Sequence, residues 1–292
     1  MRVAVYSKKI TKSTIPIFQR FLAEMDRFGW KVVLEKELKE QLVKKAGLGL
    51  NADVFTKHED FHKGIDLAFS IGGDGTFLKT VSYIRNSEVP ILGINTGRLG
   101  FLANIGDRYF EEALELVNQK RYDYQLRSLV RVETERDIFG QDNVAMNEVT
   151  LLKKDTASMI TVHAYLDDKY LNSYWADGLI VATPTGSTAY NLSCGGPIIT
   201  PGCQVHIITP IAPHNLNVRP VVVPDKLPIR LSIEGRERNY LISIDGCSKN
   251  IRQKEEVIIR KAEYMINVIK LEDTNFLDTI RNKMLWGIDN RN

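Results

Sequence analysis

The chain has 292 residues, of which 43% are hydrophobic and 26% charged, a composition that predicts one large or two ordinary globular domains. Its net charge of +3 is too small to indicate a nucleic-acid-binding protein, and no apolar run reaches the roughly 18 residues of a membrane-spanning helix. The three cysteines form no C-x-x-C pair, and the chain opens on a strand-like run rather than a signal peptide. We therefore expect a cytoplasmic protein with free thiols and no membrane or nucleic-acid partner.

Short apolar runs alternate with helical patterns in the first part of the chain. Apolar runs predict buried strands, and apolar residues that recur every three or four positions predict helices. Strands are expected at 2–6, 32–34, 67–71 and 91–94, and helices at 13–28, 36–46, after residue 74 and at 107–119. This alternation is typical of a parallel sheet with right-handed crossovers, in which ligands bind at the carboxyl ends of the strands.

From about residue 121 short strands dominate the pattern. Eight of the ten prolines lie between Pro184 and Pro228, where they suit turns and sheet edges. The expected strands, rich in Val, Ile, Thr and Tyr, are 129–134, 160–166, 205–209, 220–223, 229–233, 240–244 and 257–260. Repeated short strands with turn signals predict a β-sandwich or similar second domain. Apolar residues at helical spacing near the end predict a last helix.

The glycine-rich turn at residues 71–76 is the strongest candidate for a functional site. It joins the strand 67–71 to a helix, so its glycines let a ligand approach the backbone, and the free N–H groups at the helix start favour an anion such as phosphate. Asp74 lies in the middle of this turn, where a carboxylate indicates a metal contact or a proton acceptor. The alternative is a tight turn in which Asp74 only caps the helix.

Phosphate cannot be held here by either of the two best-known kinase motifs. The sequence contains no Walker A pattern and no H-R-D and D-F-G pair. Phosphate would instead be held by backbone and hydroxyl groups of the glycine-rich turn and of the loop after the strand at 91–94. The candidates for phosphate or ATP binding are Gly72, Gly73, Gly75, Thr76, Asn95, Gly97 and Gly100.

His58 and His62 belong to an H-E-x-x-H motif, the pattern of zinc proteases. That chemistry needs a helix long enough to present both imidazoles on one face, whereas this segment is short, polar and followed by Gly64. No third ligand follows at a familiar spacing. We therefore expect no zinc-protease site and no dedicated metal site.

Four segments carry motifs that occur together in one family of enzymes. They are Gly72-Gly73-Asp74-Gly75-Thr76, the run from Gly93 to Leu102, Asn147-Glu148-Val149, and the block from Asp177 to Tyr190 with Ser193, Gly195-Gly196-Pro197 and Pro201 after it. In this order they resemble the NAD kinases of the GGDGT kinase superfamily. The resemblance implies a Rossmann-like parallel α/β domain over residues 1–120, a β-sandwich NAD-binding domain over 121–270, and a C-terminal helix over 271–292 that returns to the first domain.

The resemblance also implies roles for individual residues. Asp74 would take the proton from the adenosine 2′-hydroxyl of NAD, and a contact to Mg²⁺ is its competing role. A weak base suffices because the proton leaves late in a loose transition state. The residues implied to bind NAD are Asp74, Gly75, Lys79, Asn147, Glu148, Asp177, Thr188, Ala189, Tyr190, Asn191, Leu192, Ser193, Ala212 and Asp245.

Simpler interpretations of these residues stay open. Asn147 and Glu148 would also suit a polar turn before a strand, and Lys79 would also suit a solvated helix face. The block at 183–188 would suit a glycine-rich turn, although it carries more hydroxyls than a turn requires. Trp175 and Cys247 stand where other members carry a basic residue and Gln or His, so contacts to the nicotinamide end are expected to differ.

The implied reaction is phosphoryl transfer from ATP, or from polyphosphate, to the 2′-hydroxyl of the adenosine ribose of NAD, which gives NADP. A divalent cation such as Mg²⁺ would bridge the donor phosphates, the site would form between the two domains, and the family's assemblies imply a homodimer or homotetramer. One alternative is a related kinase that acts on a lipid hydroxyl, which would favour an exposed apolar entrance. The other is a non-catalytic sensor that binds NAD or NADP without turnover.

Overall fold

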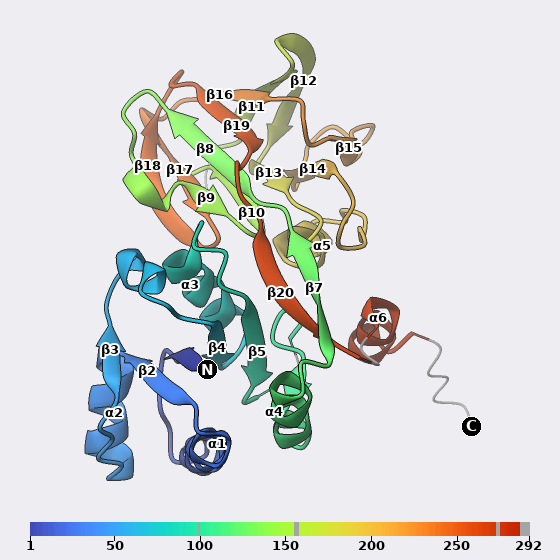
Figure 1. Ribbon diagram of the computed structural model, residues 1–292. Coiled ribbons are helices and arrows are strands. Elements are labelled where there is room, and N and C mark those ends of the chain that lie inside the picture. The colour runs from blue at the N-terminus through green and yellow to red at the C-terminus, as the bar shows by residue number, and fades with distance from the viewer. Residues whose placement is uncertain (98–99, 155–157, 273–274, 287–292) are drawn as a thin grey trace. The chain divides into compact units, whose positions relative to one another are not determined.

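The computed structural model describes residues 1–97, 100–154, 158–272 and 275–286, and it divides into two compact units. The first unit is Met1–Gln125 together with the segment that starts at Ile266, and the second is Leu126–Met265. Figure 1 labels the elements of both units. None of the helices in these described ranges is long and apolar enough to cross a bilayer.

The first unit is an α/β domain built on one sheet. Its strands are β1 (Arg2–Tyr6), β2 (Lys31–Glu35), β3 (Asp53–Phe55), β4 (Leu67–Ile71), β5 (Ile91–Asn95), β6 (Ile105–Gly106), β7 (Tyr122–Arg127) and β20 (Ile266–Leu271). Its helices are α1 (Ile15–Phe28), α2 (Lys36–Ala46), η1 (His58–His62), α3 (Asp74–Ile84), α4 (Phe110–Asn118) and α6 (Phe276–Met284). The strand order is β3-β2-β1-β4-β5-β20-β7, with β6 beside β5, and the strands from β1 to β6 pair in parallel. The predicted parallel α/β sheet is confirmed.

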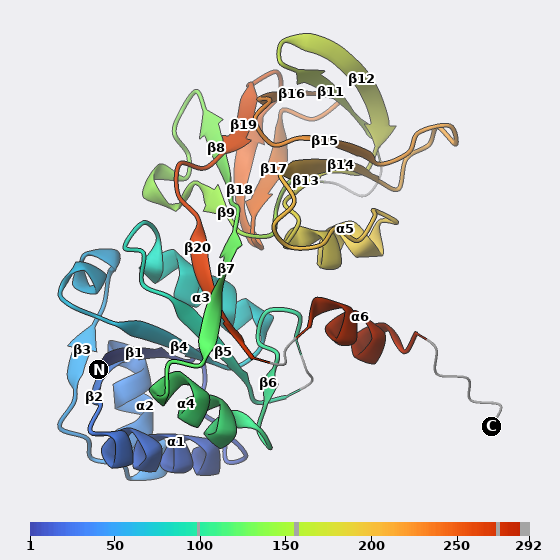
Figure 2. The same ribbon diagram turned by 45° about the vertical axis from the view of Figure 1, so that its right-hand side comes forward.

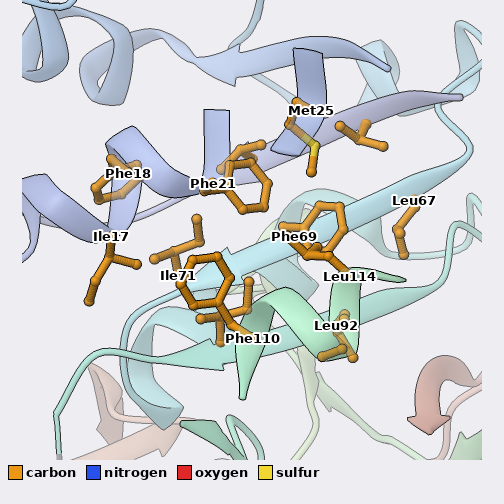
Figure 3. Close-up of a cluster of buried hydrophobic side chains, with 14 of the residues drawn as sticks. Ile17, Phe18, Phe21, Met25, Leu67, Phe69, Ile71, Leu92, Phe110 and Leu114 are labelled. Carbon is orange, nitrogen blue, oxygen red and sulfur yellow. The ribbon is translucent and has the colours of Figure 1, made fainter. Parts of the chain in front are cut away.

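Helix α1 forms because its apolar residues recur at helical spacing, and it buries that face on the sheet. Phe18, Phe21 and Met25 are at most 1% exposed, and Phe21 meets Phe69 of β4 edge to face at 5.1 Å between ring centres. Figure 3 shows this cluster, in which side chains of α1, β4, β5 and α4 meet. The burial of these aromatic and aliphatic side chains holds β4, and with it the turn at its end, in place.

Strand β20 corrects the expected domain boundary. Residues up to 270 were placed in the second domain, whereas β20 lies between β5 and β7 in the first sheet. Val268 pairs in parallel with Ile91, and Ile269 is buried in the core of the first unit. An alternating apolar pattern predicts a strand but not the sheet it joins, and so the boundary was misplaced. Helix α6 follows in the same unit and buries Ile280.

The second unit consists of two antiparallel sheets of six strands each (Figure 2). One sheet has the order β15-β14-β13-β10-β17-β18, from β10 (Glu148–Leu152), β13 (Gly178–Ala182), β14 (Val205–Ile211), β15 (Val221–Pro224), β17 (Asn239–Ile244) and β18 (Cys247–Arg252). The other has the order β12-β11-β16-β19-β8-β9, from β8 (Val130–Thr134), β9 (Val144–Ala145), β11 (Ile160–Leu166), β12 (Lys169–Ala176), β16 (Ile229–Glu234) and β19 (Val257–Lys261).

The core of the second unit contains inward-facing side chains of both sheets, which confirms the predicted sandwich. Strand β13 differs from its neighbours because it is buried on both faces. Leu179 and Val181 join the core between the sheets, whereas Ile180 and Ala182 face a second apolar cluster under the segment 183–199. Burial on both faces explains why this strand is a continuous apolar run.

Strand β18 was not expected from the sequence. Of its six residues only Ile251 is buried, so the strand shows no apolar alternation. It exists because the two-residue turn Asp245-Gly246 folds it back on β17, with Ile244 opposite Cys247. Both turn residues have positive φ, 45° and 84°, as the tightest hairpin turns require. The Asp-Gly pair, typical of two-residue hairpin turns, is the sequence signal that would have found this hairpin.

Candidate functional site

The carboxylate of Asp74 binds three consecutive backbone amides. Asp74 is the first residue of α3, directly after β4 and two glycines. One of its oxygens accepts from Phe101 N at 2.9 Å, and the other accepts from Leu102 N at 3.1 Å and Ala103 N at 3.0 Å. A carboxylate offers about four lone-pair sites, so these amides leave roughly one for another partner. Asp74 therefore connects the helix start to the loop after β5, in addition to any role towards a ligand.

Two glycines near Asp74 are required by packing. A Cβ on Gly100 would overlap the Asp74 carboxylate, whose Cγ would lie 2.6 Å away, and a Cβ on Gly72 would lie 2.8 Å from Thr76 Cβ. Non-bonded carbon atoms do not approach one another this closely, so side chains are excluded at both positions. The absence of a side chain lets the loop approach Asp74 closely enough for its amides to donate.

Gly73 and Gly75 are different, because the fold does not require glycine there. A Cβ at either position would meet nothing within 4 Å, neither residue has a positive φ, and both are exposed. Open space beside free helix N-terminal amides suits a bound anion. This observation favours the ligand interpretation of the turn over a purely structural one.

Replacing Gly75 with alanine is therefore expected to separate function from stability. Alanine favours a helix over glycine by up to about 1 kcal/mol, so the melting temperature should stay the same or rise. A methyl group in the path of the phosphate should lower kcat/KM by about 10–100-fold, the cost of a small displacement of the substrate. Gly49→Ala, at an exposed and open position away from the turn, is the control. Unchanged kinetics in Gly75→Ala would remove this glycine from the site.

The remaining candidates of the first unit divide into buried and exposed groups. The Asn95 side chain is buried and donates to Ala103 O at 3.0 Å while accepting from Gly97 N at 2.7 Å, so it shapes the loop from within. Gly97 is exposed and Thr76 is half-buried. Lys79 is exposed, with its ammonium 5.0 Å from the centre of the Tyr83 ring. Asn95 thus supports the phosphate-binding candidates rather than offering a free polar group.

In the second unit, Asp245 also accepts from three consecutive amides. Its oxygens accept from Met146 N at 2.7 Å, Asn147 N at 2.9 Å and Glu148 N at 3.1 Å. The positive φ of the hairpin turn directs the carboxylate towards this segment. Burial raises the pKa of Asp245, and the three amide donors oppose that shift. Asp245 therefore fixes the backbone of Asn147 and Glu148, a role that the sequence did not reveal.

Glu148 has a strongly altered pKa. Its side chain is largely buried, and its Oε2 has no hydrogen-bond partner. Burial, and then the nearby charge of Asp245, raise the pKa of Glu148 to about 8, against 4.5 for an ordinary glutamate. Near neutral pH the carboxyl group is therefore mostly protonated, so it can donate a hydrogen bond as well as accept one. A donor beside an acceptor suits the edge of an adenine or a ribose.

The stability of the protein should respond to Glu148 in a defined pH range. Glu148 keeps its proton up to about pH 8 in the folded state but only up to about pH 4.5 in the unfolded state. Between these two pH values the folded state therefore binds more protons than the unfolded state. The free energy of unfolding accordingly falls as the pH rises through this range. Glu148→Gln removes that dependence. We expect the variant to equal wild type near pH 4.5 and to exceed it at pH 8 by roughly 2–4 kcal/mol. Melting temperatures at pH 4.5, 6.5 and 8 test this.

The exposed Glu263 provides the control for that experiment. Glu263→Gln should leave the pH dependence of the melting temperature as in wild type. Parallel curves for Glu148→Gln and wild type would show that Glu148 is ionised in the folded protein at neutral pH, contrary to the raised pKa.

Asp177 pairs with a lysine that the sequence analysis missed. Lys153 Nζ lies 2.6 Å from Asp177 Oδ1, and both side chains are partly buried. The pair forms because the antiparallel register of β10 and β13 sets Leu152 opposite Gly178, which brings Lys153, the residue after β10, beside Asp177, the residue before β13. A cross-strand pairing of this kind cannot be read from local sequence. Lys153 adds a positive charge beside the predicted acid.

The segment 183–199 carries most of the remaining candidates, and three of its hydroxyl groups donate to backbone carbonyls, two of them within the segment. Thr183 Oγ1 donates to Met146 O, Ser187 Oγ to Pro184 O and Thr188 Oγ1 to Thr185 O. Thr183 and Ser187 are fully buried, so their hydroxyls do not support the nucleotide site that the number of hydroxyls in this block predicts. Within the segment, η3 (Gly186–Thr188) and α5 (Tyr190–Ser193) form two short turns.

The buried side chain of Asn191 holds the segment 183–199 in place through hydrogen bonds. It has no exposed surface, its Nδ2 donates to Ser187 O and Pro197 O, and its Oδ1 accepts from Thr209 Oγ1 at 2.6 Å. A side chain with all its polar atoms bonded inside the protein positions the segment and does not reach a ligand. The Asn191 side chain therefore has a structural role, and the expectation that Asn191 contacts NAD stays a prediction.

The other candidates of the second unit lie nearer the surface. Tyr190 is 40% exposed, so one part of its ring is open to a ligand. Burial, and then Cys194, raise the pKa of the Tyr190 hydroxyl. Ser193 and Ala212 are exposed, whereas Thr188, Ala189 and Leu192 are half-buried. Ala212 has a φ of 44°, unusual for alanine, directly after β14.

Comparison with known proteins identifies the family. The chain matches the ATP-NAD kinase N-terminal domain over residues 3–122 and the ATP-NAD kinase C-terminal domain over residues 146–271. An NAD kinase of Flavobacterium psychrophilum is 45% identical over 298 residues, and one of Cytophaga hutchinsonii is 41% identical over 293, each alignment covering all of both chains. The chain belongs to the NAD kinase family. The resemblance seen in the four motifs is confirmed.

Solved structures of NAD kinases and NADH kinases share the fold. The yeast NADH kinase complexed with NADH has a TM-score of 0.88 at 24% identity, over 99% of this chain and 89% of the yeast chain. The NAD kinase of Archaeoglobus fulgidus in complex with ATP has a TM-score of 0.75 at 27% identity, over 98% of this chain and 99% of the archaeal chain. The predicted combination of an α/β domain and an antiparallel β domain is therefore that of NAD kinases.

Proposed function

We propose that the chain is an ATP-dependent NAD kinase that phosphorylates the 2′-hydroxyl of the adenosine ribose of NAD. The single observation that carries this proposal is the turn at the start of α3. A carboxylate stands there beside two exposed glycines with open space around them, in a chain of the NAD kinase family. The 2′-oxygen forms a bond to the γ-phosphorus of ATP, the bond to the ADP oxygen breaks, and Asp74 accepts the hydroxyl proton.

Phosphate binding is proposed for the backbone of the turn. The amides at the start of α3, with Gly73 and Gly75 unobstructed, face a region where phosphate oxygens can approach, and the helix dipole favours their charge. Asn95 and Gly100 support this by shaping the loop that donates to Asp74. Because phosphoryl transfer depends mainly on positioning and charge, such a scaffold supplies much of what the reaction needs.

Mg²⁺ fits this arrangement only as an ion that binds together with the phosphates of the donor. Three amides already occupy most of the Asp74 lone pairs, so the carboxylate can offer a cation one contact at most. Mg²⁺ commonly keeps several waters and binds through one or two carboxylates together with substrate phosphates. When bound, it would neutralise charge on the transferred group. Its contact to Asp74 would compete with the role of Asp74 as base.

The adenosine part of NAD is proposed to bind through the second unit. Glu148 supplies a protonated carboxyl group near neutral pH and Asn147 an amide, both held by Asp245. Tyr190 offers a partly exposed ring for stacking, and Asp177 with Lys153 offers a charged pair for hydroxyl or amide groups. A cytoplasmic homodimer or homotetramer is part of the same proposal and rests on family membership alone.

The direct test is a coupled assay with the purified protein. Incubation with NAD, ATP and Mg²⁺ should yield NADP, detected with an NADP-specific dehydrogenase, in proportion to protein and with little formed by Asp74→Asn. Replacing ATP with polyphosphate tests the donor. NAD binding by calorimetry without NADP from either donor would contradict the proposal and favour a sensor. Phosphorylation of a lipid hydroxyl and not of NAD would likewise contradict it.

A further inference from the structure

We propose that His58 and His62 form a surface site for a divalent transition-metal cation. The two residues are the first and last of η1, and their Nε2 atoms lie 3.1 Å apart. Their rings meet edge to face with centres 4.7 Å apart. Neither histidine is among the residues assigned to the kinase reaction, so the inference does not depend on the proposed function.

The distance between the two nitrogens suits a shared metal ion. A bond from zinc to an imidazole nitrogen is about 2.05 Å long. Two such bonds to nitrogens 3.1 Å apart enclose an angle of about 98° at the metal, between the values of square-planar and tetrahedral coordination. A cation can therefore bind both rings with only small movements of the side chains.

The hydrogen bonding of His58 prepares its Nε2 as a ligand. His58 Nδ1 lies 2.8 Å from the carbonyl oxygen of Tyr83, which can only accept, so Nδ1 carries the hydrogen. In the neutral ring Nε2 then carries the lone pair that can bind a metal ion, which is how metal-binding histidines are commonly oriented. The 3.1 Å contact is completed by the hydrogen on His62 Nε2. His62 is exposed, so its ring can move that hydrogen to Nδ1 when a cation binds.

The neighbouring acids do not complete the site. Asp60 accepts from Thr56 N and pairs with Lys63, and Glu59 Oε2 lies 3.9 Å from Lys57 Nζ. Within the described ranges no group of three or more metal-binding side chains exists. Two imidazoles and water favour Cu²⁺, Ni²⁺ or Zn²⁺ over the oxygen-seeking Mg²⁺ and Ca²⁺. The site therefore differs from that of a zinc protease, which needs a third protein ligand.

Calorimetric titration of Ni²⁺ into the full-length protein, without a histidine tag and without nucleotide, tests the proposal. We expect about one Ni²⁺ per chain, with affinity lowered by about 10–100-fold or more in His62→Ala. His62 is exposed, so this variant should fold, which circular dichroism can verify. His163→Ala, in the second unit, is the matched control and should bind as wild type does. With Cu²⁺, electron paramagnetic resonance should show two imidazole nitrogens in wild type.

Two results would overturn the inference. The first is Ni²⁺ binding of the same affinity and stoichiometry in His62→Ala as in wild type, which would place the cation elsewhere. The second is a wild-type protein that binds no more Ni²⁺ than the double variant His58→Ala/His62→Ala. Because no NAD or ATP is present in the titration, a failure here leaves the proposed kinase activity unaffected, and a failed kinase assay leaves this result unaffected.

Discussion

The variant Asp74→Asn is expected to lose about 10²–10⁴-fold in turnover, the usual range for a positioned acid or base. Asparagine cannot accept the hydroxyl proton as a carboxylate can. It also offers one acceptor oxygen where Asp74 uses two, so an NH₂ group would face either Phe101 N or the amides of Leu102 and Ala103. A lost or opposed hydrogen bond of this kind costs about 1–3 kcal/mol, so the melting temperature should fall as well.

A second variant separates the proton role of Asp74 from its role in the loop. Asn95→Ala also releases this loop, since Asn95 donates to Ala103 O, but it leaves the carboxylate in place. We expect Asn95→Ala to lower stability and to lower turnover far less than Asp74→Asn. Asp26→Asn, at an exposed position on α1, should change neither. If Asn95→Ala lost as much turnover as Asp74→Asn, loop geometry rather than proton transfer would explain the effect.

Removing the carboxylate of Asp245 is expected to have the largest effect in the second unit. Asp245→Gly keeps the positive φ of the turn without strain and leaves three amides without their acceptor. The unfolding free energy should fall by about 3 kcal/mol or more, since each unsatisfied buried donor costs about 1–3 kcal/mol. The KM for NAD should rise by more than tenfold, because the backbone of Asn147 and Glu148 is no longer held in place. A rise of this size is what a small displacement of a substrate-binding group costs.

The conservative variant Asp245→Asn should lose less stability and less NAD affinity than Asp245→Gly. One oxygen can still accept from Asn147 N and Glu148 N, so only the bond from Met146 N is lost. Removing the charge should also lower the pKa of Glu148, because Asp245 contributes to its elevation. Ser248→Ala, exposed in the same hairpin, is the control. A KM for NAD in Asp245→Gly equal to that of wild type would show that this support does not matter for binding.

The sequence by itself determined the features that depend on neighbouring residues. Apolar runs and helical spacing located the strands and helices around the turn at 71–76, and the motifs from residue 68 to 224 identified the family. These signals are readable because a strand, a helix or a tight turn is selected by the side chains within a few positions. Strands with few buried residues, such as β18, were missed because their partners rather than their own pattern define them.

Only the tertiary structure decided how the candidate residues are used. Asp74 and Asp245 each hold three amides of a distant segment, Asn191 supports its loop from inside, Lys153 joins Asp177, and β20 enters the first sheet. Each of these contacts joins residues that lie far apart in the sequence or whose side-chain directions depend on strand register. Local sequence does not encode which amide meets which carboxylate, because that pairing arises only when the sheets and loops have packed.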